Sequence, residues 1–436
     1  MPIPTGRRAR AFLSVITLGL QGVLRLAMGV ALARILGLED YGVFVTAVSF
    51  TALLSVFWPG STGAAVTRFV GQAQGQRLFG EASLWGGQAA RLAAGSALLA
   101  MGAGAIGWGT WQSGGFGTSL AVGILALGVS LQLFSRASNL VVGNYTREAV
   151  LGVGTTLLGC AGAIVAAQVG KSTGPAIAAL GAGYCFYAVC SWPAINHDRR
   201  ATRQAASSWQ MPQYITTVAI GSIASAGFLQ AGVIVVGQSA GQASAGVFGA
   251  AMTLATPMAL AAAAGSMLLN PALARLVGSA DTARASRVLR VAENIYASFF
   301  LVTLLAFSIV GDELTALLFG DSYRAASLPT LGLLTGIALT GLAAPSVALL
   351  SMGDLQNARK TSIYAWIGAS VGASVWIWGA TEMKGDPMWI AVGFAVGTGV
   401  TSLANITRAA NVVHGRPPLL HLTLLCLPLI FALASA

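Results

Sequence analysis

Charged side chains are scarce in this sequence: Asp, Glu, Lys and Arg make up 8% of its 436 residues. An ordinary soluble domain carries about 25%, so a soluble fold of this size would lack the charges needed to cover its surface. Hydrophobic residues make up 56%, and glycine accounts for 55 residues, as is typical of closely packed helices in lipid. The composition excludes a cytosolic enzyme and predicts a polytopic membrane protein.

Residues that carry metal or hydrolytic chemistry are also few. The four cysteines lie within apolar stretches and form no Cys-x-x-Cys pair, so we interpret them as small core residues rather than disulfide or zinc ligands. Only three histidines occur, without a Ser-His-Asp or His-Glu-x-x-His pattern. The sequence therefore predicts no metal site, no cofactor and no hydrolytic site.

Acidic residues number 13 against 24 basic ones, which gives a net charge of +11. In a soluble chain this excess would suggest nucleic-acid binding, but here the basic residues lie in short gaps between apolar runs. With the N-terminus taken as cytoplasmic, 19 fall on the inner side and three on the outer side, and Arg25 and Arg34 fall within the first apolar run. The positive-inside rule explains this asymmetry, so no nucleic-acid partner is expected.

Twelve apolar stretches are long enough to cross a bilayer core, which takes about 20 residues of helix. The first exceeds the ~7–15 residues of a signal-peptide core, so we expect it to be retained. An apolar tail, Leu419 to Ala436, is either a thirteenth C-terminal helix across the membrane or an interfacial segment. The predicted spans lie near residues 11–36, 42–66, 92–111, 118–140, 149–170, 174–195, 213–237, 243–270, 291–311, 326–350, 361–381 and 387–407.

A short internal repeat relates the two groups of six spans. Gly42-Val43-Phe44 opens the second span and Gly246-Val247-Phe248 opens the eighth, and an arginine follows each glycine after 26 and 29 residues. Because six crossings restore the starting side, both halves insert with the same orientation. They would then be related by a pseudo-twofold axis along the membrane normal, with a central cavity between them.

The predicted fold is thus an all-α polytopic membrane protein with two six-helix lobes. Such a geometry suits alternating access, and no selectivity-filter motif of a channel is present. The predicted parts are an N-terminal lobe at 1–195, a cytoplasmic linker at 196–212, a C-terminal lobe at 213–407, and a basic turn with a hydrophobic segment at 408–436.

Arg25 is the most informative residue of the first span. It follows Ala11 by 14 residues, which places it about 20 Å into the helix, near mid-bilayer. A charge there costs at least ~2.5–3.5 kcal/mol and nearly always faces a bundle interior or a water-filled cavity. Gln21, one turn earlier, shares its helix face. The alternative interpretation is an arginine that caps the carbonyls of a broken helix or snorkels to an interface.

The acidic residues are all assigned to loops or span ends, seven outside and six inside. A buried arginine without a carboxylate partner in the chain predicts an anion from elsewhere. Phosphate or diphosphate fits the planar fork of guanidinium donors. The same absence argues against a cation exporter, which usually needs an intramembrane carboxylate.

Other polar residues extend this hypothesis into a path for an anionic head group. Gln132 and Asn139 share a face of the fourth span, where their amides would bind sugars. For the inner arginines the alternative is positive-inside anchoring, and near the outer end Arg34 would alternatively pair with Glu39 or Asp40. The predicted substrate-binding residues are Arg25, Gln21, Arg68, Gln132, Arg136, Asn139, Arg275 and Arg34.

Three short motifs resemble those of a known family. The run Arg34-Ile35-Leu36-Gly37 followed by Tyr41-Gly42-Val43-Phe44 resembles the Arg-x-Leu-Gly…Tyr-Gly-x-Phe junction of polysaccharide-repeat flippases. These belong to the multidrug/oligosaccharidyl-lipid/polysaccharide exporter superfamily. Leu318-Phe319-Gly320-Asp321-Ser322-Tyr323, followed by two alanines, is similar to a Leu-Tyr-Gly-x-x-Tyr…Ala segment found there, and Gly353-Asp354 to Lys360 resembles its basic turn.

This resemblance implies a V-shaped, two-lobed bundle that flips undecaprenyl-diphosphate-linked oligosaccharide from the inner to the outer leaflet. Lipid II flippases of the superfamily use arginines of their first helices, for which Arg25 and Arg68 are the nearest matches. Those flippases usually have two further C-terminal helices, so an O-antigen or exopolysaccharide unit is favoured as cargo. The implied setting is the bacterial inner membrane. The implied partners are the polyprenyl-diphosphate-linked oligosaccharide, membrane lipid and a polysaccharide polymerase.

Two other functions stay open at this point. A multidrug or cation antiporter on the same scaffold should have a buried carboxylate in its cavity, whereas a flippase cavity should be electropositive and acid-free. A membrane-embedded glycosyltransferase or polymerase should have a large outer loop, but the longest outer stretch, Gly311 to Ala325, is short. A transporter without enzymatic activity is therefore favoured.

Overall fold

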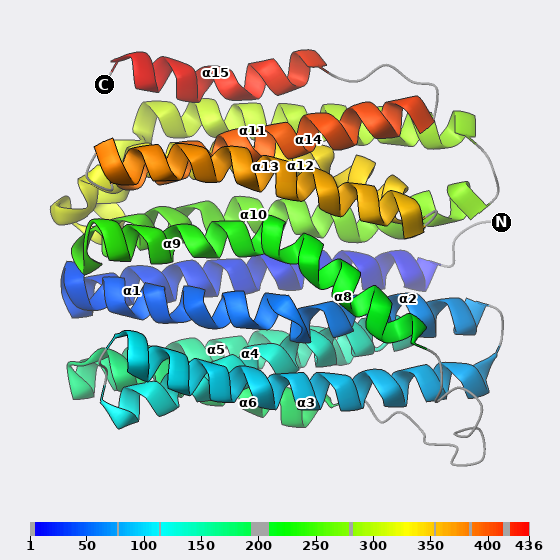
Figure 1. Ribbon diagram of the computed structural model, residues 1–436, viewed down its shortest axis with the longest axis horizontal. Helices are drawn as coiled ribbons and strands as arrows, with labels where there is room; N and C mark the ends of the chain where they lie inside the picture. Colours follow the sequence, from blue (N-terminus) through cyan, green and yellow to red (C-terminus); the bar gives the residue numbers. More distant parts are fainter. Residues whose placement is uncertain are drawn as a thin grey trace. The chain divides into compact units, whose positions relative to one another are not determined.

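The computed structural model describes residues 5–75, 78–112, 115–192, 209–278, 282–352, 355–382, 386–412 and 419–435. Within these ranges every regular element is a helix (Figure 1), which confirms the predicted all-α class. Eleven described helices are long and apolar enough to cross a membrane. The first of them, Ile16–Gly71, contains two predicted spans, so the described helices account for all twelve.

The first two spans are separated by a backbone break. Helix α1 (Thr5–Phe57) is interrupted at Gly37, whose φ of 78° and ψ of 179° lie in a region that side-chain-bearing residues avoid. Helix α2 (Pro59–Gly75) begins at a proline, a residue whose missing N–H costs nothing in a first helical turn. The break at Gly37, the glycine of the Arg-x-Leu-Gly motif, ends the first span.

The chain divides into two compact units. The first comprises Met1–Leu24 with Thr46–Ala231, and the second comprises Arg25–Val45 with Gly232–Ala436. They differ from the predicted lobes because the segment around the Gly37 break packs with the C-terminal helices. The predicted linker at 196–212 lies outside the described residues up to position 208, and α8 starts within its last residues.

After α2, the first unit contains α3 (Phe79–Trp111), α4 (Phe116–Val142), α5 (Tyr145–Gly170), α6 (Thr173–Ser191), α8 (Gln210–Ser222) and the π-helical turn η1 (Ile223–Gly227). Helix α9 (Phe228–Ser239) begins in the first unit and ends in the second. The second unit contains α10 (Gln242–Gly278), α11 (Thr282–Phe319), the 3₁₀ turn η2 (Asp321–Ala326), α12 (Ser327–Met352), α13 (Leu355–Glu382), α14 (Pro387–Val412) and α15 (Leu419–Ser435).

The two units repeat one packing pattern. In the first, α4 packs against α2, α3 and α6, and α5 packs against α6. In the second, α12 packs against α10, α11 and α14, and α13 packs against α14. Helices α13 and α14 are the orange helices of Figure 1. Helices α2 to α6 thus correspond in order to α10 to α14, so the packing supports the internal repeat.

The C-terminal apolar tail forms a helix, α15, that packs against α11 and α12. Its 17 residues make it about 26 Å long, slightly short of a bilayer core of about 30 Å. A membrane crossing by this helix stays a prediction. The basic turn expected before it lies at positions 413–418, outside the described residues.

Candidate substrate-binding site

Arg25 lies in α1, twelve residues before the break at Gly37, or roughly 18 Å along the helix. If the break marks the outer end of the span, this depth is near the middle of a core about 30 Å thick. The side chain is half-buried, and its Nε atom is buried without a hydrogen-bond partner. Within the part of the chain that the structure describes, no carboxylate or carbonyl binds this guanidinium.

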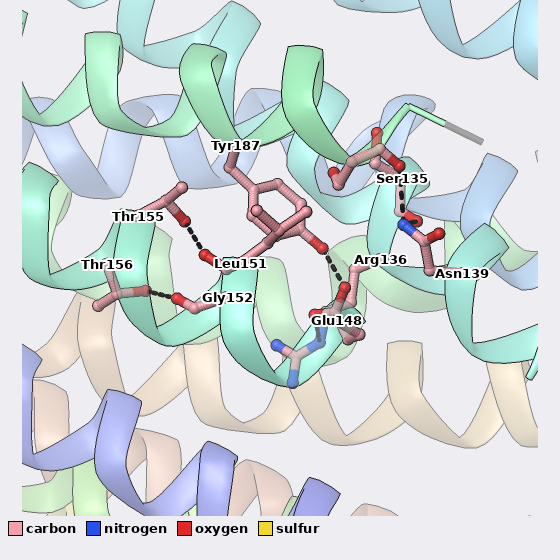
Figure 2. A network of polar contacts seen from close by, with 10 residues as sticks. Ser135, Arg136, Asn139, Glu148, Leu151, Gly152, Thr155, Thr156 and Tyr187 are labelled. Atoms are coloured by element: carbon pink, nitrogen blue, oxygen red, sulfur yellow. Dashed lines mark hydrogen bonds and ion pairs between the residues drawn. The ribbon is translucent and has the colours of Figure 1, made fainter. Parts of the chain in front are cut away.

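A polar network in the first unit joins Arg136 of α4, Glu148 of α5 and Tyr187 of α6 (Figure 2). The Nε atom of Arg136 lies 3.4 Å from Oε1 of Glu148, and the Tyr187 hydroxyl donates a hydrogen bond to the other carboxylate oxygen. The side chain of Glu148 is 7% exposed and that of Arg136 is 23% exposed. The network thus contains a buried carboxylate that has a partner of opposite charge.

Glu148 lies within helix α5 and is buried, so the expectation that the spanning helices contain no acidic residue is wrong. The sequence prediction starts the fifth span at residue 149, but α5 begins at Tyr145 and includes Glu148 in its first turn. A hydropathy window ends before a charge, whereas the helix continues because neighbouring helices satisfy that charge. Glu293 of α11, buried at 2% exposure, contradicts the same expectation in the second unit.

Two predicted site residues adjoin the network. Gln21 of α1 is 2% exposed, and its amide lies against Gly152, one turn beyond Glu148. A Cβ atom at Gly152 would lie 2.6 Å from Nε2 of Gln21 and 3.5 Å from Oε1 of Glu148. Asn139 of α4 donates from Nδ2 to the Ser191 carbonyl of α6 at 2.8 Å. The structure therefore brings Gln21 and Arg136 to one buried carboxylate that sequence reasoning missed, whereas Asn139 binds the neighbouring end of α6.

The other predicted inner residues are not part of this network. The guanidinium of Arg68 lies over the ring of Tyr214 in α8, with Cζ 4.7 Å from the ring centroid, a cation–π contact. Gln132 is buried in α4 at 7% exposure, and no hydrogen bond to it is found among the described residues. The side chain of Arg275 lies outside the described part of the chain.

Arg34 caps a helix in the second unit. Its Nε atom donates to the Leu318 carbonyl at 2.7 Å and its Nη2 atom to the Leu317 carbonyl at 2.5 Å. These carbonyls belong to the last turn of α11, where a cation also meets the negative end of the helix dipole. The contacts favour a structural role for Arg34, with a helix end in place of the expected Glu39 or Asp40.

Two of the three motifs that carry the family resemblance meet at this same joint. The Tyr323 hydroxyl of η2 donates to the Ala33 carbonyl at 3.2 Å. Its ring lies edge-on to that of Tyr41, with centroids 6.2 Å apart, and the Tyr41 hydroxyl is 3.0 Å from Oγ1 of Thr253 in α10. The motifs therefore build a structural joint in the second unit.

The repeated glycines Gly42 and Gly246 also face each other in the second unit. A Cβ atom at Gly42 would lie 1.8 Å from the carbonyl oxygen of Gln242, and one at Gly246 would lie 2.2 Å from that of Leu38. In both pairs of repeat-related positions the numbers differ by 204. The contact is reciprocal, as expected where two copies of a repeated helix cross about a local twofold axis.

Breaking the Arg136–Glu148 pair is expected to destabilise the first unit. Glu148→Ala leaves a partly buried guanidinium uncompensated, so it should lower the free energy of unfolding by about 2–3 kcal/mol, less than the ~3–5 of a fully buried pair. The loss is measured by comparing the thermal unfolding of the variant and the wild-type protein in detergent. Arg136→Met combined with Glu148→Leu should cost less than the two single changes together; additive losses would contradict the pairing.

A family model described as "Polysaccharide biosynthesis protein" matches residues 31–328. No curated protein sequence matches the chain. Among solved structures, an inward-facing multidrug resistance MATE family transporter of the MOP superfamily is similar, with TM-score 0.65 and 14% identity, covering 92% of this chain and 98% of that one. A Vibrio cholerae MATE transporter, VcmN, in its bent form has TM-score 0.61 and 15% identity, covering 93% and 97%.

Identities this low show the fold alone, and that fold is one of membrane transporters. The family match is independent of it, covers more than half of the chain and contains both motifs of the joint around Arg34 and Tyr323. Together these findings confirm the resemblance drawn from the sequence. The chain belongs to the polysaccharide biosynthesis protein family and has the fold of MOP-superfamily transporters.

Proposed function

We propose that this protein flips lipid-linked oligosaccharides by alternating access. Its cargo would be an undecaprenyl-diphosphate-linked repeat unit of O-antigen or exopolysaccharide, moved from the inner to the outer leaflet of the bacterial inner membrane. Membership of a polysaccharide biosynthesis family and a transporter fold support the proposal. The excess of basic residues on one side supports a cytoplasmic N-terminus.

One observation carries the choice of an anionic cargo: Arg25 has no protein partner among the described residues. Arg34 binds helix carbonyls, Arg68 lies on Tyr214, and Arg136 pairs with Glu148. Of the predicted site arginines with described side chains, Arg25 is the one whose guanidinium binds no protein group among the described residues. A half-buried cation in a membrane helix needs an anion, and a diphosphate offers two acceptors for its fork of donors.

Gln21 is proposed to bind cargo as well. It lies one turn before Arg25 on α1, and Gly152 leaves room for its amide where a side chain would not. The Arg136–Glu148 pair borders this amide and would position it rather than contact cargo. Gln132 and Arg275 keep their proposed roles toward sugar and head group without a described contact that supports them.

A multidrug or cation antiporter is the second candidate, and the buried carboxylates favour it. The acid-free criterion for a flippase is not met, because Glu148 and Glu293 are both buried in spanning helices. However, Glu148 is already neutralised by Arg136, so it offers no free charge to a cationic drug. The unpartnered guanidinium of Arg25 would in addition repel such a drug.

Reconstitution separates the two functions. The purified protein is placed in lipid vesicles with a fluorescent undecaprenyl-diphosphate oligosaccharide, and a membrane-impermeant reductant bleaches the outer leaflet. In protein-free vesicles about half of the fluorescence should be lost, because only the outer leaflet is bleached. With a flippase the loss should exceed half, because lipid from the inner leaflet becomes accessible. Bleaching that stops at about half, together with ethidium uptake driven by a sodium or proton gradient, would instead identify an antiporter.

A further inference from the structure

The second unit contains a buried carboxyl group that has no ion-pair partner among the described residues. Glu293 of α11 is 2% exposed. Its Oε1 atom accepts a hydrogen bond from the hydroxyl of Ser346 in α12 at 3.1 Å. No other hydrogen bond and no ion pair to this carboxyl is found within the described residues. Glu293 therefore differs from Glu148, which has the guanidinium of Arg136 beside it.

The groups around Glu293 on its own helix do not neutralise it. Arg290, one turn earlier, is exposed and directs Nη2 to the Ser286 hydroxyl at 3.3 Å. Tyr296, one turn later, donates its hydroxyl proton to the Ala262 carbonyl of α10 at 3.1 Å. Arg290 thus acts on the carboxyl electrostatically, without an ion pair between them among the described residues.

The neighbouring helices bring little further charge. Helix α12 contains no ionisable residue, and η2 follows the far end of α11, roughly 40 Å along the helix from Glu293. Arg408 of α14 has a buried Nε atom without a partner and is not bonded to Glu293. The remaining ionisable groups on packed helices are Arg275 of α10 and His421 of α15, whose side chains lie outside the described part, and Cys426 of α15.

Apolar side chains close this carboxyl off from the inner end of its helices. A buried cluster of Leu289, Leu349, Leu350 and Ala409 joins α11, α12 and α14. Leu289 lies one turn before Glu293 on α11, and Leu349 lies about one turn after Ser346 on α12. Since α11 starts and α12 ends on the predicted inner side, the cluster separates the carboxyl from that side.

Helix α12, which binds Glu293 through Ser346, contains a proline directly beside this contact. Pro345 lies inside α12 and cannot donate to the carbonyl of Gly341, which favours a bend there. The next residue, Ser346, makes the one hydrogen bond to Glu293. A change in the proton occupancy of the carboxyl would therefore act beside the position where Pro345 interrupts the hydrogen bonding of α12.

We infer that Glu293 is a proton-binding site that couples transport to the proton gradient. A carboxylate buried without a countercharge is strongly disfavoured, so the group binds one proton from water on one side through a new O–H bond. When the apolar cluster opens, the same O–H bond breaks and the proton passes to water on the other side. This inference rests on the proposed transport function for its cargo, and on the geometry of Glu293 for its site.

Infrared spectroscopy tests proton binding without any cargo. The purified protein should show the carbonyl stretch of a buried protonated carboxylic acid, and Glu293→Gln should remove that band. Glu313→Gln, an exposed acid on the same helix, is the matched control and should leave it intact. Glu293→Asp should shift the band, and serves if the Gln variant does not fold. A band unchanged in both Glu293 variants would overturn the assignment.

Coupling is measured with the fluorescent oligosaccharide lipid in vesicles. A proton gradient should accelerate flipping several-fold in wild type and in Glu313→Gln, and this acceleration should vanish in Glu293→Gln. A response to sodium in place of protons, or gradient dependence retained in Glu293→Gln, would overturn the inference. Loss of the infrared band without lipid movement by wild type would support the proton site and contradict the proposed cargo.

Discussion

The Arg25→Ala variant is expected to reach the membrane in normal amount and to abolish surface glycan in a host that lacks its own flippase. The guanidinium of Arg25 has a buried Nε atom and no described protein partner, so its removal breaks no hydrogen bond or ion pair among the described residues. Losing a charge-assisted partner of a diphosphate should cost about 3 kcal/mol of cargo binding, roughly a hundredfold in affinity. Glycan on the cell surface and protein in the membrane fraction are the measurements.

Two further variants sharpen this result. Arg25→Lys keeps the charge but loses the planar fork, so it should retain partial activity, about tenfold below wild type if one charge-assisted hydrogen bond is lost. Arg91→Ala, an exposed arginine of α3, is the control and should support normal glycan. Full glycan in Arg25→Ala, or equal loss in Arg91→Ala, would remove the proposed anion role of Arg25.

Replacing Gly42 with alanine is expected to destabilise the second unit strongly. The new Cβ atom would lie 1.8 Å from the Gln242 carbonyl oxygen, which is backbone and cannot rotate away. The helices must separate, at a cost of at least about 3 kcal/mol, the upper part of the range for overpacked cores. Gly246→Ala should behave alike because its Cβ atom would lie 2.2 Å from the Leu38 carbonyl oxygen.

The reciprocal geometry makes the double variant diagnostic. Gly42→Ala with Gly246→Ala should cost clearly less than the two changes summed, because either one already forces the same crossing apart. Gly95→Ala in α3, where a Cβ atom would meet nothing within 4 Å, is the matched control and should be neutral or stabilising by about 0.5–1 kcal/mol. Strict additivity, or unchanged thermal unfolding in detergent for Gly42→Ala, would contradict the close crossing.

The spans were predictable because the requirement to cross a bilayer is written locally in the chain. Each predicted apolar stretch coincides with a helical part of the chain, and the glycine at 37 marks the end of the first span. The boundaries were less predictable: α3 begins at Phe79 rather than near residue 92, and α5 begins at Tyr145. Helices continue beyond the apolar window because backbone hydrogen bonds, and not side-chain polarity, decide where they end.

The candidate site was predictable only in part, because polar partners come from distant segments. Arg34 finds its carbonyls 283 and 284 residues away, and no local pattern indicates that pairing. Glu148 looks like a loop residue until α4 and α6 bring Arg136 and Tyr187 to it. In contrast, the depth of Arg25 follows from helix rise alone, so the sequence indicated a predicted site arginine whose guanidinium binds no protein group among the described residues.

Direct binding of the synthetic lipid to the purified protein tests the central claim. The dissociation constants of undecaprenyl-diphosphate oligosaccharide for wild type, Arg25→Ala and Arg91→Ala are measured in the same detergent, with the uncharged undecaprenol-linked oligosaccharide as reference. We expect tight binding by wild type and Arg91→Ala, about a hundredfold weaker binding by Arg25→Ala, and equally weak binding of the uncharged lipid by all three. Equal affinity of wild type and Arg25→Ala for the diphosphate would contradict the account.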